Sequence, residues 1–456
     1  MKIIHVIPGF LPEHVAGTEV YCWSICKFLL AQGIETEVVV PGFGQEQNST
    51  YTYDGIRVVK YAEPTKQTRL HISGLALPEG IKAFREYIRE ARPNCVHFQG
   101  IYAGIGITVQ HIAEVKALGI PVIYTLHLPG HVCATETLIY KEKEICDGII
   151  RPVRCASCHL VHQGHSNTVA NVMAGLSGVL QKTGIDAGYW NSSLGTGLSG
   201  VNRIVDIKKK LGQLAMHCDK VAVIAKWFQK IMIDNGFPEE KTIFVPPALP
   251  YSGEPGHAAP KLAFNFEGSL RLIFIGRLSP LKGIDLLLNA IGKLPEEKIE
   301  LSIYGKGDQA YIDKCRKLSG DRRNIHWRGI VSREDLLSTM SQHDMLCLPS
   351  AFSEMAPLVI QEAFGAGIPV LASEVYGNAE LIQHNKNGLL FTFKSLDSLY
   401  AQLKRLLEEN TLLSSLKQGV RPPIPFETVA AQYLAIYKSL QPGKFADAAQ
   451  QPVISA

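Results

Sequence analysis

Short apolar runs rich in β-branched residues alternate along the chain with longer amphipathic stretches. Residues 2–7, for example, form an apolar run, and a helical pattern follows at residues 18–32. Such alternation is typical of parallel sheets covered by helices. We expect further helices at residues 79–91 and 105–118, and strands at residues 2–7, 35–40, 57–61, 95–98, 121–126, 220–224, 242–245, 270–275, 299–304, 324–327, 345–348 and 369–372.

The pattern restarts near residue 270, which predicts two α/β domains. A chain of 456 residues also exceeds the size, roughly 250–300 residues, at which a single core stops growing. The Pro- and Gly-rich stretch 246–256 is the expected linker. We predict an N-terminal domain at residues 1–250, a C-terminal domain at 262–425, a helix at 426–442 that packs back on the N-terminal domain, and a tail without periodicity beyond it.

The charge balance excludes some classes of partner. Lys and Arg number 46 against 42 Asp and Glu, so the net charge of +4 is small, and no dense basic patch of a nucleic-acid binder is present. The first apolar run ends at Pro8, too soon for a signal peptide, and no apolar window is long enough to span a bilayer. We expect a soluble, cytoplasmic protein that contacts the inner face of a membrane at most peripherally.

Residues 353–370 carry the densest functional pattern. An expected strand ends just before this stretch, and a helix is predicted to begin at about Pro357, since proline suits the first helical position. The N-terminus of a helix offers free amides and partial positive charge to a diphosphate. Glu354 and Glu362 flank that N-terminus, where one can bind sugar hydroxyls and the other ribose hydroxyls. The alternative is a pair of solvated surface glutamates.

A second pattern delivers two cations to the end of another strand. The expected strand at 270–275 leads to Gly276 and Arg277, and Lys282 follows in the loop before a helix. Such cations can hold a diphosphate and stabilise the charge that grows on it when a sugar leaves. Taken alone, both side chains read equally well as surface charges.

Together these segments resemble the family-four retaining glycosyltransferases of the GT-B fold, in which two Rossmann-like domains face each other across a cleft. The pair Glu354 and Glu362 matches the glutamates of that family, eight residues apart, and Arg277 and Lys282 match its arginine and lysine. The resemblance spans nearly the whole chain, although Ala16 stands where the family usually has a glycine. Further matching segments are Gly17 in the first glycine loop, residues 124–127 (T-x-H), Gly377, Glu380 and residues 387–390 (N-G-L-L).

This resemblance implies transfer of a sugar, a hexose first of all, from a nucleotide-diphosphate-sugar to a glycan or lipid-linked acceptor in polysaccharide or glycoconjugate biosynthesis. UDP is the favoured nucleotide. The leaving phosphate would accept the proton of the acceptor, so neither a protein base nor a catalytic metal is expected. The implied catalytic residues are Arg277, Lys282, Glu354 and His127, and the implied donor-binding residues are Gly17, Gly276, Val331, Met355, Ala356, Leu358 and Glu362.

Four of the ten cysteines cluster in a predicted insertion at about residues 128–200. Four thiolates with one C-x-x-C pair can form a tetrahedral zinc site, and an iron–sulfur cluster is the less favoured alternative. A structural metal would pin a long insertion that lacks a core of its own. Unligated thiols are the remaining interpretation. The cysteines are Cys133, Cys146, Cys155 and Cys158, with His159, His162 and His165 as substitute ligands.

Other functions share this fold. An epimerase or a phosphorylase would use the same two domains, and a sugar-nucleotide-binding protein could retain the site without turnover. A Rossmann dehydrogenase is disfavoured because Gly305 and Gly307 form only a fragment of the dinucleotide fingerprint. Contact with a lipid-linked acceptor could involve the stretch that carries Lys82, Phe84, Arg85, Tyr87, Arg89 and Arg92, although a solvated helix face explains these charges equally well.

Overall fold

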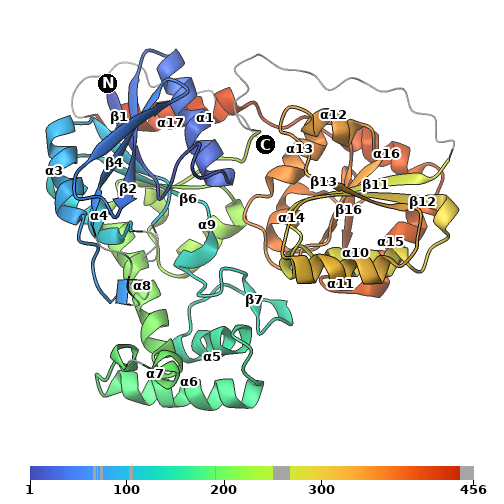
Figure 1. Cartoon of the computed structure of the whole chain (residues 1–456), viewed down its shortest axis with the longest axis horizontal. Coiled ribbons are helices and arrows are strands. Elements are labelled where there is room, and N and C mark those ends of the chain that lie inside the picture. The colour runs from blue at the N-terminus through green and yellow to red at the C-terminus, as the bar shows by residue number, and fades with distance from the viewer. Residues whose placement is uncertain are drawn as a thin grey trace.

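The computed structural model describes residues 1–64, 68, 70–71, 75–101, 106–190, 192–249 and 268–441. The chain forms two α/β domains, each built around its own sheet, and a helical insertion extends from the first of them (Figure 1). Most of the expected linker and the tail beyond residue 441 lie outside the described residues. Within the described residues, no helix combines the length and the hydropathy that crossing a membrane requires.

The first sheet has the strand order β10-β9-β6-β5-β1-β2-β4-β3. Neighbouring strands are parallel except at the edge pair β3–β4. The order reverses between β1 and β5, and ligands of such sheets bind beyond the carboxyl ends of the strands at this point. The strands are β1 (Lys2–Val6), β2 (Glu35–Phe43), β3 (Ser49–Tyr53), β4 (Ile56–Glu63), β5 (Cys95–Phe98), β6 (Val122–Leu126), β9 (Lys220–Val223) and β10 (Thr242–Phe244).

The second sheet is entirely parallel, in the order β13-β12-β11-β14-β15-β16. This order reverses between β11 and β14, which is the switch point of a doubly wound sheet. Separate apolar clusters cover its two faces, one around Leu272 and Leu301 and the other around Ile273 and Leu346. The strands are β11 (Leu270–Ile275), β12 (Ile299–Tyr304), β13 (Ile325–Gly329), β14 (Met345–Leu348), β15 (Val370–Ser373) and β16 (Gly388–Phe391).

Helices cover both sheets, and several begin at a polar side chain that accepts a hydrogen bond from the first turn. Asp308 and Ser395 accept backbone N–H groups from the first turns of α11 and α15. The helices of the two domains are α1 (Gly17–Ala31), α3 (Ile81–Ala91), α4 (Val109–Ala117), α9 (Lys226–Asp234), α10 (Ile284–Ile291), α11 (Gln309–Ser319), α12 (Leu336–Ser341), α13 (Leu358–Gly365), α14 (Tyr376–Leu381), α15 (Leu396–Glu408) and α16 (Leu412–Gly419).

The insertion separates β6 from β9 and forms the lower body in Figure 1. Helix α5 packs on α6 and α8, and α8 leads the chain back to the first sheet. A two-stranded hairpin, β7–β8, precedes these helices and is antiparallel. The elements are β7 (Ile139–Tyr140), β8 (Glu144–Ile145), α5 (Pro152–His162), α6 (Asn167–Lys182), α7 (Ser193–Leu198) and α8 (Gly200–His217).

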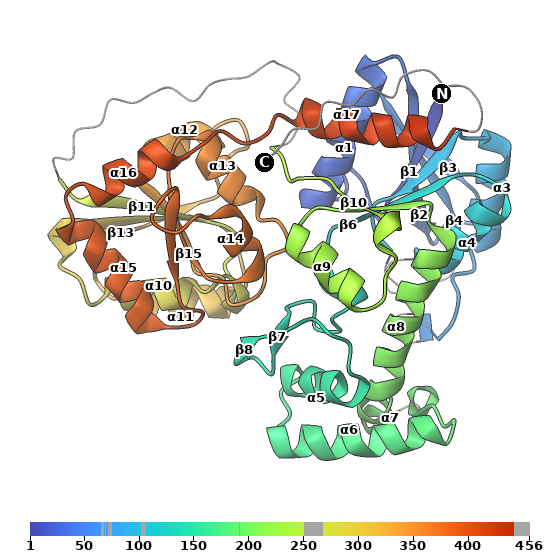
Figure 2. The ribbon, with the colours of Figure 1, turned by 180° about the vertical axis from the view of Figure 1, so that it is seen from behind.

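The last helix, α17 (Phe426–Ser439), returns from the second domain to the first (Figure 2). It packs against α1, where Val429 and Tyr433 join an apolar cluster with Ile25. Tyr433 also contacts Thr125 at 2.9 Å between the two hydroxyl oxygens. The chain therefore crosses between the domains twice, once before β11 and once before α17.

Candidate active site and cysteine centre

Most of the predicted donor-binding residues lie at the switch point of the second sheet, whereas Gly17 starts α1 of the first domain and Val331 follows β13. Gly276 and Arg277 follow β11, and residues 349–357 connect β14 to α13. Helix α13 begins one residue later than predicted, because Pro357 is extended and precedes the first turn. Helices α13 and α14 stand on the side turned toward the first domain (Figure 1).

Glu354 and Lys282 form the most tightly held ion pair of this region. Lys282 Nζ lies 2.6 Å from Glu354 Oε1, and Ser350 Oγ donates to the same oxygen at 2.7 Å. Glu354 is buried, with 7% of its surface exposed. The Lys282 ammonium also lies 5.1 Å from the centre of the Phe352 ring. The structure thus brings together a cation and a carboxylate that stand 72 residues apart in the sequence.

Two glycines hold the loop that carries Glu354. Gly283 has a φ of 68°, and a Cβ at this position would lie 1.9 Å from the carbonyl oxygen of Pro349. A Cβ at Gly377 would lie 2.1 Å from the carbonyl oxygen of Glu354. Because both positions exclude a side chain, the loop can approach the start of α10 and of α14 this closely.

Arg277 and Val331 lie on two other loops of the second domain. Arg277 is exposed, and the described residues provide it with no ion pair, so its guanidinium is free to bind an anion. Val331 is half-buried two residues after β13, on the loop of a different strand. Their predicted contacts with a diphosphate and a base remain predictions.

The residues at the start of α13 contact the first domain. The Met355 side chain is buried and joins the apolar cluster of that domain, and the Trp227 indole donates to the Met355 carbonyl at 3.2 Å. Ala356 and Leu358 are half-buried at the helix start. A Cβ at Gly17, the first residue of α1, would lie 3.7 Å from Leu358 Cδ1. The N-termini of α1 and α13, both electropositive, therefore meet between the domains.

Glu362 lies within α13 in a desolvated position. Burial raises the pKa of its carboxyl to about 7, and the positive charge of Arg333 opposes this rise. Burial in turn lowers the pKa of Arg333. Sequence reasoning missed Arg333, because it stands in the polar run 332–335, which reads as exposed loop.

His127 follows β6 in the first domain and is held by Gln99 at the end of β5. His127 Nε2 lies 2.9 Å from Gln99 Oε1, and the Tyr21 ring packs edge-on against the imidazole with centroids 5.2 Å apart. Since the amide oxygen only accepts, Nε2 carries the proton. Burial lowers the pKa of His127 to about 3, so the imidazole is neutral near pH 7. The role of Gln99 was not predicted, since a glutamine after a strand carries no signal by itself.

Further contacts join the two domains beside this site. The Trp227 and Tyr376 rings stack with centroids 4.9 Å apart and planes 11° apart. Glu380 accepts the backbone N–H groups of Lys226 and Trp227 at 3.0 and 2.8 Å. A carboxylate of the second domain therefore caps helix α9 of the first.

The four clustered cysteines of the insertion line a single cavity. The other lining side chains are mainly apolar and include Leu138 and Ile149. All ten cysteines of the chain are unpaired. Burial raises the pKa of Cys158 to about 11, with a further contribution from the neighbouring thiols. The arrangement is compatible with a bound metal, and the ligation itself remains a prediction. The four are Cys133, Cys146, Cys155 and Cys158.

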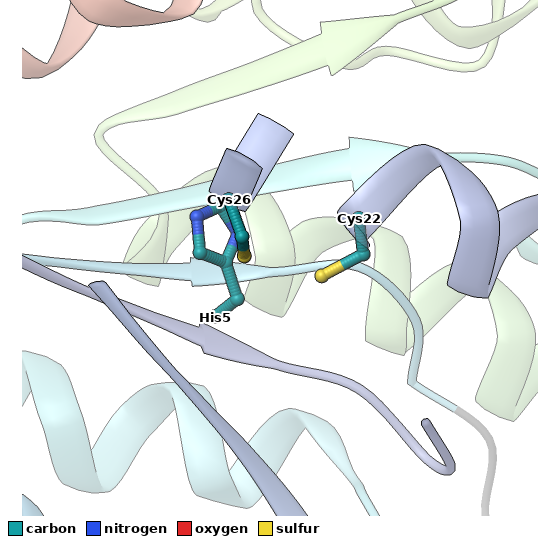
Figure 3. A group of neighbouring side chains, drawn as sticks. All are labelled: His5, Cys22 and Cys26. Carbon is teal, nitrogen blue, oxygen red and sulfur yellow. The ribbon is translucent and has the colours of Figure 1, made fainter. Parts of the chain in front are cut away.

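A second group of potential ligands lies in the core of the first domain. Figure 3 shows His5 of β1 beside Cys22 and Cys26 of α1, and their ligand atoms lie within 4.8 Å of one another. All three side chains are fully buried. Structural zinc sites take four ligands, whereas the described residues supply three here. We interpret this group as a hydrogen-bonded part of the core.

The basic stretch on α3 presents its charges to solvent. Its lysine and arginines are exposed, whereas Phe84 is buried in the core and the Tyr87 hydroxyl donates to Glu37. This arrangement fits the alternative of a solvated helix face, and contact with a lipid-linked acceptor stays a prediction.

Two doubly wound sheets with a candidate site between them form the GT-B architecture. The profile of the glycosyl transferase 4-like domain matches residues 16–173, and that of glycosyl transferases group 1 matches residues 261–421. The chain thus has the two domains of the GT-B fold, and each of them matches the profile of a glycosyltransferase domain.

Curated relatives and a solved structure agree with this assignment. An uncharacterized glycosyltransferase of Methanocaldococcus jannaschii is 30% identical over 174 residues, which cover 37% of this chain and 44% of that protein. The amylovoran biosynthesis glycosyltransferase AmsK of Erwinia amylovora is 27% identical over 293 residues, or 62% of this chain and 69% of AmsK. HepE of Anabaena, solved with UDP and glucose, has a TM-score of 0.59 at 15% identity, covering 96% of this chain and 100% of HepE. The match thus spans less than half of the first relative and about two thirds of the second.

Proposed function

We propose that this protein transfers a hexose from a nucleotide-diphosphate-sugar to a glycan or lipid-linked acceptor, with retention of the anomeric configuration. One observation carries the proposal: Arg277, the Lys282–Glu354 pair and the N-terminus of α13 gather at the switch point of the second sheet. UDP is the favoured nucleotide, supported by the UDP bound to HepE. The similarity to AmsK supports a role in polysaccharide biosynthesis.

The positive groups of this site suit the departure of a nucleoside diphosphate. Arg277, Lys282 and the amides at the start of α13 would stabilise the charge that grows on the phosphate as the bond to the sugar breaks. We expect them to supply the charge that a divalent ion supplies in other enzymes. The bond from the anomeric carbon to the phosphate oxygen breaks on the face where the acceptor oxygen bonds. The leaving phosphate takes the proton of the acceptor.

The remaining predicted residues would position the donor. Glu354, fixed by Lys282 and Ser350, would accept hydrogen bonds from sugar hydroxyls, and Glu362 from ribose hydroxyls. The neutral imidazole of His127 would approach the sugar from the first domain. The unpaired cysteines fit a reducing, cytoplasmic compartment.

The test measures donor binding and turnover separately. Calorimetry with UDP-, GDP- and ADP-sugars identifies the nucleotide, and release of nucleoside diphosphate in the presence of glycan and lipid-linked acceptors measures transfer. We expect Arg277→Ala to lower kcat by about 10²- to 10³-fold. Lys298→Ala is the matched control, because Lys298 is an exposed cation at the amino end of β12, away from the carboxyl ends that form the site.

Three results would contradict the proposal. Failure of a folded protein to bind any nucleotide-sugar would remove the donor site. Tight binding without turnover on any acceptor would favour a sugar-nucleotide-binding protein. Proton NMR of the freshly formed linkage reports its anomeric configuration, and an inverted product would exclude the retaining mechanism.

A further inference from the structure

The four cysteines of the insertion line one cavity, but their sulfurs are not gathered as closely as a single zinc ion requires. A tetrahedral zinc ion with sulfur at ~2.3 Å requires sulfurs about 3.8 Å apart. Among the described residues, only His5, Cys22 and Cys26 bring three such ligand atoms within 4.8 Å of one another. No three of the four cavity sulfurs are therefore that close, although all four line one cavity.

We propose that Cys133, Cys146, Cys155 and Cys158 hold a [4Fe–4S] cluster. In such a cluster each thiolate binds its own iron at a separate corner, so the sulfurs stand further apart than around one ion. The mainly apolar lining of the cavity would also exclude water from the cluster. This spacing reverses the order of preference that the sequence alone suggested.

N–H groups lie within hydrogen-bond distance of three of the four sulfurs. The backbone N–H of Lys141 lies 3.1 Å from Cys158 Sγ, and that of Arg151 lies 3.4 Å from Cys155 Sγ. Such N–H···S contacts stabilise thiolates bound to iron. A guanidinium nitrogen of Arg154 lies 3.8 Å from Cys146 Sγ, which adds the positive charge that an anionic cluster needs.

Part of the backbone between the first two cysteines is strained. Glu136 and Leu138 have φ of 58° and 50°, a region that costs energy for residues other than glycine. The positive φ of Lys141 and Glu142 belongs to the hairpin turn, in which the Lys143 N–H donates to the Tyr140 carbonyl. The only regular structure in this stretch is the short β7–β8 hairpin. A cluster that ties this segment to α5 would offset the strain.

The segment from Cys133 to Cys146 contacts the donor-binding domain at three points. The Thr137 carbonyl accepts the Ser353 N–H at 2.9 Å, directly beside Glu354. The Tyr376 hydroxyl donates to the Cys146 carbonyl at 2.9 Å, and Lys394 Nζ donates to the Glu142 carbonyl at 2.6 Å. The cluster thus acts structurally, by fixing a bridge between the insertion and the loop at the active site.

The experiment uses the full chain purified without oxygen. We expect about four iron and four acid-labile sulfide per chain, together with the broad visible absorbance of a thiolate-bound cluster. Cys155→Ser should abolish both signals and open residues 133–158 to proteolysis. Cys218→Ala, which removes a buried thiol outside the cavity, should leave them unchanged.

A cysteine variant could lose both signals because it misfolds. The wild-type protein therefore serves as a second test, in which the cluster is removed and then reconstituted. Loss of iron should make the segment 133–158 sensitive to protease, and reconstitution should restore its protection. Stoichiometric zinc without iron, or four freely titratable thiols in the anaerobic protein, would overturn the proposal. These readouts do not depend on glycosyltransferase activity, so they stand apart from the proposed function.

A separate observation concerns the outer face of helix α6, which lies furthest from the sheets in Figure 1. Its opposite face is buried against α5 and α8. The exposed face is apolar and, with spacings of three and four residues, continuous. Tyr189 and Trp190, in the turn that follows α6 in the sequence, are also exposed, at 62% and 43%. The face consists of Val169, Val172, Leu176 and Val179, which are 45%, 58%, 54% and 60% exposed.

We infer that this α6 face rests on an anionic lipid bilayer. Contiguous exposed apolar side chains mark interaction surfaces, and aromatic rings favour the interface between lipid and water. The charge pattern selects the occupant: α6 and the residues that follow it to 185 contain no acidic residue and carry Lys182, whereas Arg151 and Arg154 are paired with Asp147 on the α5 side. Such a surface complements the negative charge of a cytoplasmic leaflet.

Vesicle sedimentation tests this inference. The protein should bind vesicles of phosphatidylglycerol and phosphatidylcholine more strongly than vesicles of phosphatidylcholine alone. Val172→Asp with Leu176→Asp should reduce binding at least tenfold, and Leu318→Asp on α11 should not. Equal binding by the double variant would refute the inference. A dimer that the double variant dissociates would instead assign the face to a second copy of the chain.

Discussion

Glu362 offers a quantitative test of the site, because its carboxyl is already desolvated before any donor binds. Burial raises its pKa from 4.5 to about 7, and a shift of this size corresponds to about 3 kcal/mol. The folded protein therefore holds the proton more tightly than the unfolded chain. Its stabilising contribution is complete below pH 4.5, falls as the pH rises to about 7 and is then lost.

Glu362→Gln removes this titration. We expect the free energy of unfolding of the variant to exceed that of the wild type by a margin that grows with pH, up to about 3 kcal/mol between pH 4.5 and 7.5. Urea titrations across this range measure the margin. Glu297→Gln, at an exposed position in the same domain, is the control and should add no pH dependence. A margin that does not change with pH would refute the reasoning.

Donor binding should show the complementary effect. Ribose hydroxyls that donate to the carboxylate favour its ionised form and lower its pKa, so binding releases a proton. The affinity of the wild type for the intact nucleotide-sugar should rise about tenfold from pH 6 to pH 8, and the affinity of Glu362→Gln should stay flat. The diester phosphates of the donor keep a constant charge over this range, so a rise shared by both proteins would exclude Glu362 as its source.

Three other substitutions probe the frame of the site. Gly283→Ala should destabilise the protein by several kcal/mol, since its Cβ would meet the Pro349 carbonyl at 1.9 Å. Gly33→Ala, with a similar φ of 69° and open space, should cost only the strain of the positive φ, and equal losses would contradict this account. Lys282→Met should cost about 3 kcal/mol in urea unfolding, because Glu354 is left buried without its cation, and unchanged stability would show that the ion pair is dispensable. Trp227→Ala removes the stacking on Tyr376 and the hydrogen bond to Met355, so it should increase the radius of gyration measured by X-ray scattering. An unchanged radius would show that other contacts suffice to hold the two domains together.

The sequence predicted the two sheets because their central strands are buried on both faces. Residues 2–7 and 270–275, for example, are predominantly apolar, and the structure places strands there. Strand β3 was missed because it is an edge strand with no buried residue and so lacks an apolar pattern. The expected helix at 105–118 begins only at Val109, after Thr108 caps it, and residues 102–105 lie outside the described part.

The candidate site could be predicted only where local sequence carries the constraint. Gly377 belongs to a recognisable motif because a side chain there would strike the Glu354 carbonyl. Arg333, in contrast, becomes relevant only when tertiary packing places it near Glu362. The spacing of the cysteine sulfurs is likewise a tertiary property, so the sequence alone could not choose between zinc and an iron–sulfur cluster.

The position of α17 also fixes the order in which the protein can be completed during synthesis. Residues of this last helix, such as Val429 and Tyr433, fill the same core as Ile3 and Ile25 near the beginning of the chain. The first domain therefore leaves the ribosome with part of its apolar surface uncovered, and it stays so while the second domain is translated. The second domain, whose strands end at Phe391, can close its own sheet first. The domain that is made first is thus the last to be finished.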